Sequence, residues 1–334
     1  MTLTTDDLRA LPKAHLHLHL EGALRRETAR ELAERYGLPL LDTGPYADQA
    51  GFVAAYESAR DLVRSLDDLA RVAREIVEDA AATGVVWTEL YHVPFSYTGR
   101  LGAAEGVVEA VLDGLDQGTR ATGCGAGLIL AHNRARPLAD ATATAAIARR
   151  HAGRGIVGFG LAGNEAAYPA ALFREVFASL KDSGLLLVPH AGEGAGAESV
   201  RSAWRDLGAD RISHGISAVA DPALVRLLAE HRICLDVCPT SNVRLGAAPS
   251  LAEHPLPRLL AAGVPVSLGS DCPAFFGVDI IDEYRAAHRD MGLTARQLAG
   301  MARDSLRCSA APDGIRAAAL EALANWTAAH TARG

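Results

Sequence analysis

The chain has 334 residues, and its 33 lysines and arginines against 40 aspartates and glutamates leave a formal charge of −7. This acidic balance argues against a nucleic-acid groove and against binding to an anionic membrane surface. No apolar run reaches the roughly 20 residues of a membrane helix, and the N-terminal residues lack the basic and then apolar order of a signal peptide. The five cysteines are odd in number and include no CxxC pair, which fits a reducing cytoplasm rather than a disulfide framework. We therefore expect a soluble cytoplasmic protein whose partner is a small molecule.

Short β-rich runs alternate with helical runs along the whole chain. The expected strands cover residues 14–20, 85–93, 125–132, 156–163, 185–192, 210–216, 233–239 and 264–271. The helical runs between them include residues 27–37, 103–118, 142–153, 171–184, 221–231 and 254–263, and many of these end at glycine. Eight strand–helix repeats predict an α/β fold closed as a (β/α)8 TIM barrel. No GxGxxG motif follows a strand, which disfavours a dinucleotide-binding sheet.

Two segments exceed this plain repeat, and the sequence of both is typical of helices. Residues 38–80 follow the first strand–helix unit, and residues 293–331 follow the last strand. No linker-like change of composition interrupts the chain, so we expect a single domain over residues 1–334. The sequence leaves the oligomeric state open.

The first expected strand carries His15, His17 and His19 at a spacing of two residues. Alternate residues of a strand share a face, so all three histidines should point into the barrel. His17 and His19 lie nearest the C-terminal end of the strand, where barrel enzymes place their active sites. His15 should lie about 6–7 Å deeper, as a supporting or packed residue.

Other expected strands also end in residues that can bind a metal or carry a proton. The fifth ends with His190, followed three residues later by Glu193, and the sixth and eighth end with His214 and Asp271. Each alone could have an ordinary role, because a strand-end aspartate can cap the next helix. Together on one rim, three histidines and a carboxylate suit a borderline-soft divalent cation such as Zn²⁺, with an open position for water.

Six motifs follow one another along the chain: HLHLEG (17–22), GLAGNE (160–165), PHAGE (189–193), RISHG (211–215), CPTSN (238–242) and SLGSD (267–271). In order and spacing they resemble the signatures of the adenosine/adenine deaminase family of the amidohydrolase superfamily. The resemblance covers nearly the whole chain, and the first, third and fourth motifs form a highly specific set. It implies a zinc-dependent (β/α)8 barrel that hydrolyses the exocyclic amine of a 6-aminopurine.

By this resemblance, four residues would hold one Zn²⁺ per chain: His17, His19, His190 and Asp271. Zinc lowers the pKa of water towards about 7 and so supplies a nucleophile at neutral pH. Asp271 is therefore expected to take part in catalysis as well as in metal binding.

The same resemblance assigns the remaining roles. Glu193 would be protonated when substrate binds and would give its proton to the ring nitrogen next to the attacked carbon, which requires burial to raise its pKa. His214 would orient the attacking water and stabilise charge at that carbon. Gly163 would donate its backbone N–H to the purine, because only glycine allows so close an approach. Glu21 would meet a sugar hydroxyl if the substrate has one, and a solvent-exposed Glu21 is the alternative.

Cys272 is the clearest departure from the family pattern. Relatives usually carry a second aspartate here that donates a hydrogen bond to purine N7, and a thiol is a weak donor. We therefore expect retained chemistry with altered substrate recognition. The alternative is that Cys272 only packs against Phe275 and Phe276. Because adjacent strand residues face apart, Cys272 should not join Asp271 as a metal ligand.

Smaller departures lie in the loops. Asn164 replaces the usual aspartate of the GLAGNE motif, and His92 stands where relatives commonly carry an arginine near the end of the second strand. Arg100, Arg134 and Arg136 follow the second and third strands, on the side where the tail of a larger substrate could lie. Loop arginines are more often simply solvated.

The leading hypothesis is zinc-dependent deamination of an adenine-type ring, free or as a nucleoside. One alternative is a deaminase of a larger 5′-modified adenosine such as 6-aminodeoxyfutalosine. A catalytically silent ligand-binding barrel would require the loss of a metal ligand or of Glu193, and none is missing. A two-metal hydrolase of esters or phosphotriesters usually needs a carboxylated lysine at a strand end. The only lysines, Lys13 and Lys181, lie at N-terminal ends of strands or in helix–strand loops.

Overall fold

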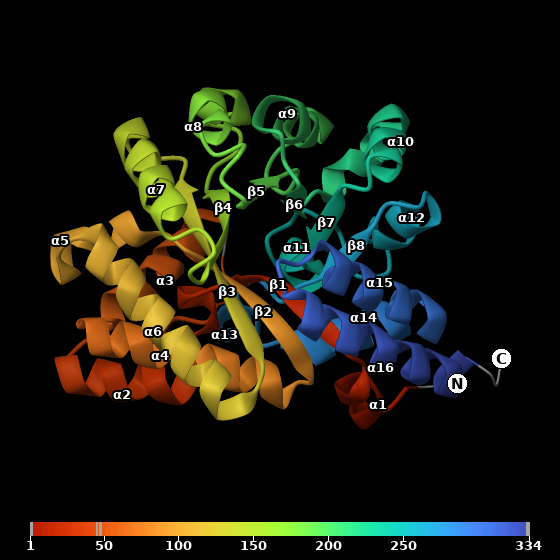
Figure 1. The fold of residues 1–334 in the computed structure, drawn as a ribbon, viewed down its shortest axis with the longest axis horizontal. Coiled ribbons are helices and arrows are strands. Elements are labelled where there is room, and N and C mark those ends of the chain that lie inside the picture. Colours follow the sequence, from red (N-terminus) through yellow and green to blue (C-terminus); the bar gives the residue numbers. More distant parts are fainter. Residues whose placement is uncertain (1–2, 45, 47–48, 332–334) are drawn as a thin grey trace.

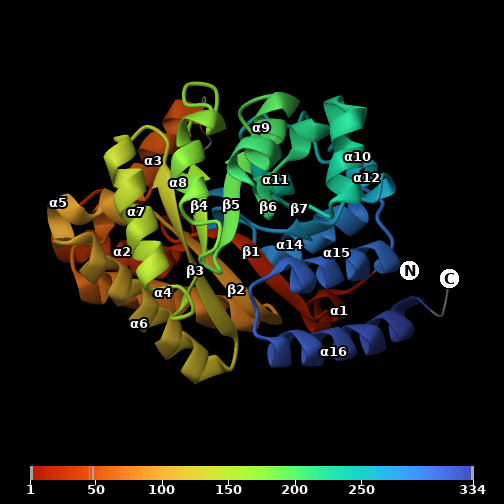
Figure 2. The same cartoon turned by 45° about the horizontal axis from the view of Figure 1, so that its top comes forward.

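A computed structural model of the chain describes residues 3–44, 46 and 49–331. Its strands form one parallel sheet in the order β1 to β8, in which each strand pairs with the next along the chain. The sheet closes where β1 meets the segment that follows β8 (Figures 1 and 2). There the backbone N–H of Asp271 donates to the His17 carbonyl at 3.1 Å, and the N–H of His19 donates to the Asp271 carbonyl at 3.0 Å. The predicted (β/α)8 barrel is confirmed.

All eight expected strands are present, each within a few residues of its predicted limits. They are β1 (Lys13–His19), β2 (Val85–His92), β3 (Gly125–Asn133), β4 (Ile156–Ala162), β5 (Leu186–Ala191), β6 (Arg211–His214), β7 (Cys234–Val237) and β8 (Val266–Leu268).

Helices surround the sheet on its outer side (Figure 2). The α-helices are α1 (Thr5–Ala10), α2 (Arg26–Tyr36), α3 (Gln49–Leu62), α4 (Leu66–Ala82), α5 (Thr98–Leu101), α6 (Ala104–Thr122), α7 (Leu138–Arg150), α8 (Arg174–Ala178), α9 (Ala197–Leu207), α10 (Pro222–Glu230), α11 (Pro239–Arg244), α12 (Leu256–Ala261), α13 (Pro273–Phe276), α14 (Ile280–Arg289), α15 (Ala295–Cys308) and α16 (Asp313–Thr331). Short 3₁₀ helices are η1 (Glu21–Ala23), η2 (Pro94–Ser96), η3 (Ala170–Phe173) and η4 (Ile216–Ala220).

The two extra segments are helical, as expected. The insertion after the first repeat contains α3 and α4, and the residues after β8 include α15 and α16. α4 begins with a capping box, in which the Asp68 N–H donates to Ser65 Oγ at 3.0 Å and the Ser65 N–H donates to Asp68 Oδ2 at 3.0 Å. Leu69, Val72 and Ile76 recur at helical spacing and are buried, which fixes the face that α4 turns to the core.

One predicted helix is shorter than expected. Within residues 171–184 the chain forms the 3₁₀ helix η3 and then α8, which ends at Ala178. Beyond it, the Ser179 hydroxyl donates to the Val176 carbonyl at 2.7 Å and the Ser183 hydroxyl donates to the Leu180 carbonyl at 2.6 Å. Serine side chains that bond to nearby backbone compete with helical hydrogen bonds, which accounts for the early end.

A hydrogen-bonded group of charged side chains is buried inside the barrel. Arg211 on β6 donates to the carboxylates of Glu89 on β2 and Asp236 on β7, and all three residues are at most 1% exposed. The Trp87 indole and the Ala310 backbone N–H also donate to Glu89 Oε1, at 3.0 and 2.7 Å. Burial is the largest influence on Asp236 and, although Arg211 opposes it, raises the pKa of that carboxyl to about 6. We call Glu89, Arg211 and Asp236 the barrel triad.

Replacing Arg211 with methionine is expected to lower the free energy of unfolding by about 3–5 kcal/mol, because two buried carboxyl groups lose their cation. Chemical denaturation followed by circular dichroism measures this change. Arg120→Met is the matched control, since Arg120 pairs with Asp116 on the exposed side of α6 and should contribute little. Equal, small effects of the two substitutions would contradict a stabilising role for the barrel triad.

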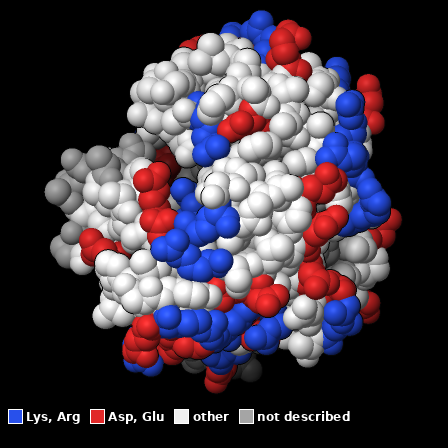
Figure 3. All heavy atoms as spheres, turned by 90° about the vertical axis from the view of Figure 1, so that its left-hand side faces the viewer, with Lys and Arg blue, Asp and Glu red and all other residues white. Residues whose placement is uncertain are grey.

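Charged side chains of both signs lie on the outer helices, between wide uncharged areas (Figure 3). On the side that carries α2 and α5 in Figure 1, basic and acidic residues lie next to one another (Figure 3). Arg71 on α4, for example, donates to Glu31 on α2 at 2.7 Å and to Glu75 at 2.8 Å. None of the helices in the described part of the chain is long and apolar enough to cross a membrane.

Candidate metal and catalytic site

Three imidazoles from opposite sides of the barrel meet at its C-terminal rim. His17 and His19 come from β1 and His190 from β5. The Nε2 atom of His190 lies 3.1 Å from the Nε2 atom of His17 and 3.1 Å from that of His19. The three ligand atoms are therefore close enough to share one cation, as their strand positions predicted.

Asp271 completes this arrangement from the segment after β8. Its Oδ1 lies 3.3 Å from His19 Nε2 and 3.7 Å from His17 Nε2, while its Oδ2 accepts from the Ser241 hydroxyl at 2.6 Å. Burial acts to raise the pKa of Asp271, but the neighbouring imidazoles and Ser241 hold it below its ordinary value. His17, His19, His190 and Asp271 are called the His–Asp cluster below.

The donor set of the His–Asp cluster fits a divalent metal ion. Two atoms that each lie 2.0–2.1 Å from one tetrahedral cation are about 3.3 Å apart, close to the separations above. The Nδ1 atom of His17 lies 3.0 Å from the Asp236 carbonyl, so it carries the proton and leaves the Nε2 lone pair directed into the cluster. His15 is not part of the set, because its Nε2 accepts from the Ser270 backbone N–H at 3.1 Å.

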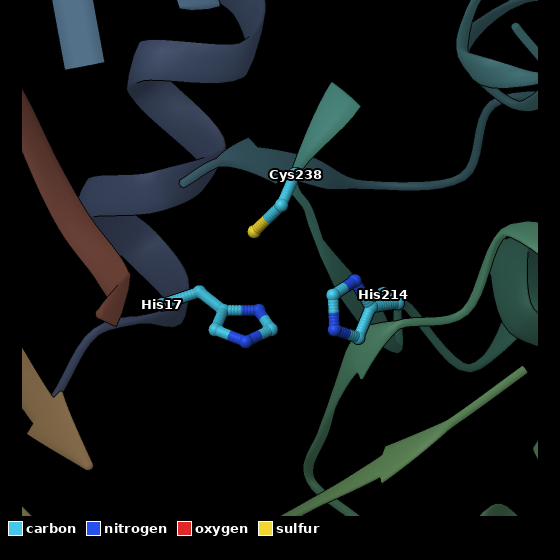
Figure 4. Close-up of side chains that lie close together, drawn as sticks. All are labelled: His17, His214 and Cys238. Atoms are coloured by element: carbon cyan, nitrogen blue, oxygen red, sulfur yellow. The ribbon is translucent and has the colours of Figure 1, made fainter. Parts of the chain in front are cut away.

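Cys238 lies next to the His–Asp cluster. Figure 4 shows its thiol directed towards the neighbourhood of His17 and His214. The Sγ atom lies 3.9 Å from the carbonyl oxygen of Asp236, and burial raises the pKa of the thiol well above its ordinary value. The thiol donates to this backbone carbonyl and packs beside the His–Asp cluster.

Glu193 and His214 form the second part of the site. Glu193 Oε2 lies 3.4 Å from His214 Nε2, and Glu193 Oε1 is buried with no hydrogen-bond partner in the described structure. Burial, followed by the negative charges of Asp271 and Glu165, raises the pKa of Glu193 well above its ordinary value. A carboxyl group that stays protonated beside an ionised one can act as a proton donor.

The backbone is strained at two of these residues. Among the described non-glycine residues, three have a positive φ, and two of them are His214 at 65° and Asp271 at 57°. Such conformations are uncommon outside glycine and cluster at functional sites.

Glu165 supports the loop that carries Glu193, a role that the sequence did not reveal. Its carboxylate accepts the backbone N–H groups of Gly192, Glu193 and Gly194 at 2.7, 3.0 and 3.1 Å, and the Ser199 hydroxyl at 2.6 Å. The only available signal was its place as the last residue of the GLAGNE motif.

Gly163 and Glu21 occupy the rim in different ways. Gly163 follows β4, is exposed, and has a φ of 96°; a Cβ there would lie 2.8 Å from Asn133 Oδ1. Glu21 is only 3% exposed, so the alternative of a solvated carboxylate is wrong. The Tyr56 and Tyr97 hydroxyls donate to it at 2.6 and 2.8 Å, contacts that the sequence did not predict.

Cys272 lies closer to Asp271 than predicted. Its Sγ is 3.4 Å from Asp271 Oδ1, so the expectation that the two side chains face apart is wrong. Strand β8 ends at Leu268, and the positive φ of Asp271 breaks the alternation before Cys272 is reached. A Cβ on Gly22 would lie 2.5 Å from the thiol sulfur, so Cys272 is packed directly against that glycine.

The loop arginines bond within the protein. Arg134 is 1% exposed, so it is not a solvated loop arginine. Its guanidinium donates to the carbonyl of His190 at 2.7 Å and is therefore not free to meet the tail of a substrate. Arg100 donates to Asp61 at 2.8 Å, and Arg136 donates to Asp140 at 2.9 Å.

His92 and Lys13 also stand out in the sequence, His92 as a departure from the family pattern and Lys13 for the two-metal hydrolase alternative. Both ring nitrogens of His92 are buried without a hydrogen-bond partner in the described structure. Lys13 lies at the N-terminal end of β1 and donates to backbone carbonyls, including that of Thr83 at 2.7 Å, so it cannot serve as a metal-bridging carboxylated lysine at the rim.

Fold and site together define a barrel hydrolase whose rim can hold a divalent cation beside a buried carboxyl group with a raised pKa. The family model described as adenosine deaminase matches residues 12–326. A Streptomyces virginiae protein provisionally named adenosine/adenine deaminase is 41% identical over 331 residues, covering 96% of this chain and 98% of its own length. The aminodeoxyfutalosine deaminase of Streptomyces coelicolor is 37% identical over 316 residues, covering 90% of this chain and 81% of its own.

Solved structures agree with these relatives. The adenine deaminase from Arthrobacter aurescens has a TM-score of 0.87 and 32% identity, and the match covers 94% of this chain and 98% of that one. An amidohydrolase from Burkholderia ambifaria, solved with bound Zn, has a TM-score of 0.86 and 26% identity, with 98% and 96% covered. The chain belongs to the adenosine deaminase family, and is thereby a hydrolytic deaminase of the amidohydrolase superfamily.

Proposed function

We propose that this protein uses zinc to hydrolyse the exocyclic amino group of an adenine-type ring, free or in a nucleoside, and releases ammonia. The observation that carries the proposal is the convergence of the His–Asp cluster beside Glu193, a buried carboxyl group with a raised pKa. Neither part alone would be specific, but hydrolytic deamination needs both a nucleophile and a proton donor at neutral pH.

The His–Asp cluster would hold one Zn²⁺ per chain. Three imidazole nitrogens and one carboxylate oxygen suit this ion, and the related amidohydrolase from Burkholderia ambifaria carries bound Zn. When bound, Zn²⁺ supplies Lewis acidity and lowers the pKa of water.

The other residues would act directly on the ring. Glu193 would protonate the ring nitrogen next to the carbon to which the water oxygen adds. One proton of that water would pass to the exocyclic nitrogen, whose bond to carbon then breaks so that ammonia leaves, and the other would return to Glu193 as the carbonyl forms. His214 would orient the water and stabilise charge at that carbon. Gly163 would donate its backbone N–H to the purine. Glu21, held by Tyr56 and Tyr97, would meet a sugar hydroxyl where the substrate has one.

A panel of aminopurines tests this proposal. Ammonia release from adenine, adenosine and a 5′-extended adenosine such as 6-aminodeoxyfutalosine should rank the three by kcat/KM. The last compound is included because an aminodeoxyfutalosine deaminase is among the relatives. Release from at least one is expected, and a metal-loaded preparation that is inactive on all of them would point to a silent binding protein.

Replacing Cys272 with aspartate should raise kcat/KM for adenosine by roughly tenfold or more, because the new carboxyl group can donate to purine N7. The present thiol lies 3.4 Å from Asp271 Oδ1, so a carboxyl group in its place would be close to a second buried carboxylate. Two such neighbouring carboxyl groups do not both ionise, and the new one should stay protonated. Cys272→Ser is the matched control, as it supplies a hydroxyl of similar size. If the wild type already deaminates adenosine efficiently and aspartate brings no gain, Cys272 does not govern substrate choice.

We further propose that the chain acts in the cytoplasm as one domain, on a small-molecule purine and without a nucleic-acid or membrane partner. The acidic charge of −7 and the mixed charges of Figure 3 support this.

A further inference from the structure

A chain of hydrogen bonds runs from His214 away from the His–Asp cluster. Asn242 Nδ2 lies 3.1 Å from His214 Nδ1, and Asn242 Oδ1 lies 3.2 Å from His254 Nε2. The chain ends at the backbone N–H of Leu256, which lies 3.1 Å from His254 Nδ1. The three side chains are 1%, 0% and 3% exposed for His214, Asn242 and His254, so water does not compete for these bonds.

The donor and acceptor of each of these hydrogen bonds follow from the last one, between the Leu256 N–H and His254. A backbone N–H can only donate, so His254 Nδ1 must be the acceptor. Burial lowers the pKa of His254 to about 4, which leaves its ring neutral with the single proton on Nε2. That proton is donated to Asn242 Oδ1, and the amide must then present its Nδ2 hydrogens to His214. His214 Nδ1 is therefore an acceptor, and the proton of the neutral His214 ring lies on Nε2.

We propose that Asn242 and His254 are positioning residues that hold His214 in the tautomer protonated on Nε2, so that His214 acts as a hydrogen-bond donor towards the reacting atoms and not as a proton acceptor. The second half of this proposal rests on the proposed function. Its geometric basis is that Nε2, the atom 3.4 Å from Glu193 Oε2, has no free lone pair. Proton uptake at Nδ1 would instead set two N–H groups against each other at Asn242.

The tautomer can be measured without any assay of activity. In the zinc-loaded protein labelled with ¹⁵N-histidine, long-range ¹H–¹⁵N correlation spectra distinguish a protonated from an unprotonated ring nitrogen. The signals of His214 among the 12 histidines are assigned by their loss in His214→Asn. We expect protonated Nε2 and unprotonated Nδ1. The opposite pattern in the wild type overturns the proposal, whatever the enzyme does to aminopurines.

Two sets of variants test the consequence. Asn242→Asp replaces the donating amide with an acceptor, so the His214 proton should move to Nδ1 and kcat should fall by about 10²-fold, with a smaller change in KM and unchanged metal content. His254→Leu frees the Asn242 amide to turn over and should give a mixture of tautomers, with kcat reduced in proportion to the fraction protonated on Nδ1. His254→Gln keeps an N–H donor for Asn242 and should restore the wild-type spectrum and rate.

His288→Leu is the control, because His288 lies on α14 and bonds to the Leu293 carbonyl instead of to His214, Asn242 or His254. It should change neither the His214 spectrum nor kcat. If the tautomer changes in Asn242→Asp while kcat stays at the wild-type level, the donor role of His214 is overturned although the positioning stands. If the panel of aminopurines yields no ammonia, the proposed function fails separately, and the spectra still decide the tautomer.

Discussion

Alanine at His17, His19 or His190 is expected to abolish ammonia release, because in the proposed site each imidazole would supply one of four protein ligands to the metal. The same substitutions should lower the bound metal, which elemental analysis of the wild type should find at about one transition-metal ion per chain. Removing the metal from the wild type with a chelator should abolish activity, and Zn²⁺ should restore it.

His231→Ala serves as the control for these variants, since His231 is exposed beyond the end of α10. It should keep the metal content and rate of the wild type. Full turnover by a preparation shown to contain no metal would rule out the proposed mechanism.

Glu193→Gln is expected to reduce kcat by ~10²–10⁴-fold while metal content stays intact. Glutamine keeps the size and most of the hydrogen bonding of the protonated side chain, but it has no acidic proton to transfer. The backbone N–H of Glu193 would still be held by Glu165, so the loop should keep its conformation. Steady-state kinetics on the best substrate of the panel, with elemental analysis of the same sample, measure both quantities.

Glu198→Gln is the matched control, because Glu198 has a 72% exposed side chain on the nearby helix α9. It should leave kcat unchanged. Loss of metal from Glu193→Gln together with a change in KM alone would instead assign Glu193 a structural role.

The sequence predicted the barrel and its rim because both depend on local, repeating signals. Strand and helix periods alternate along the chain, and parallel strands bring their C-terminal ends to one rim. These signals place His17, His19 and His190 together on the rim, and the structure does bring their Nε2 atoms together.

The contacts that hold these residues in place were not predictable in the same way. Tyr56 lies on α3, in the inserted segment, and its bond to Glu21 spans 35 positions with no periodic signal. Asn242 lies on α11, but its partner His254 lies in the loop before α12, where spacing carries little information. The error at Cys272 has a similar cause, because the strand rule was applied beyond the end of β8.

The barrel triad has a consequence for how this family can diverge. Glu89, Arg211 and Asp236 come from three different strands, yet none can change alone without leaving a buried ionisable group short of its partners. A mutation at one position is therefore expected to be purged unless the others change with it. Across homologous barrels these positions should covary, being either all ionic or all replaced by apolar residues. Such linked inheritance would make the triad a marker of shared descent that is independent of substrate.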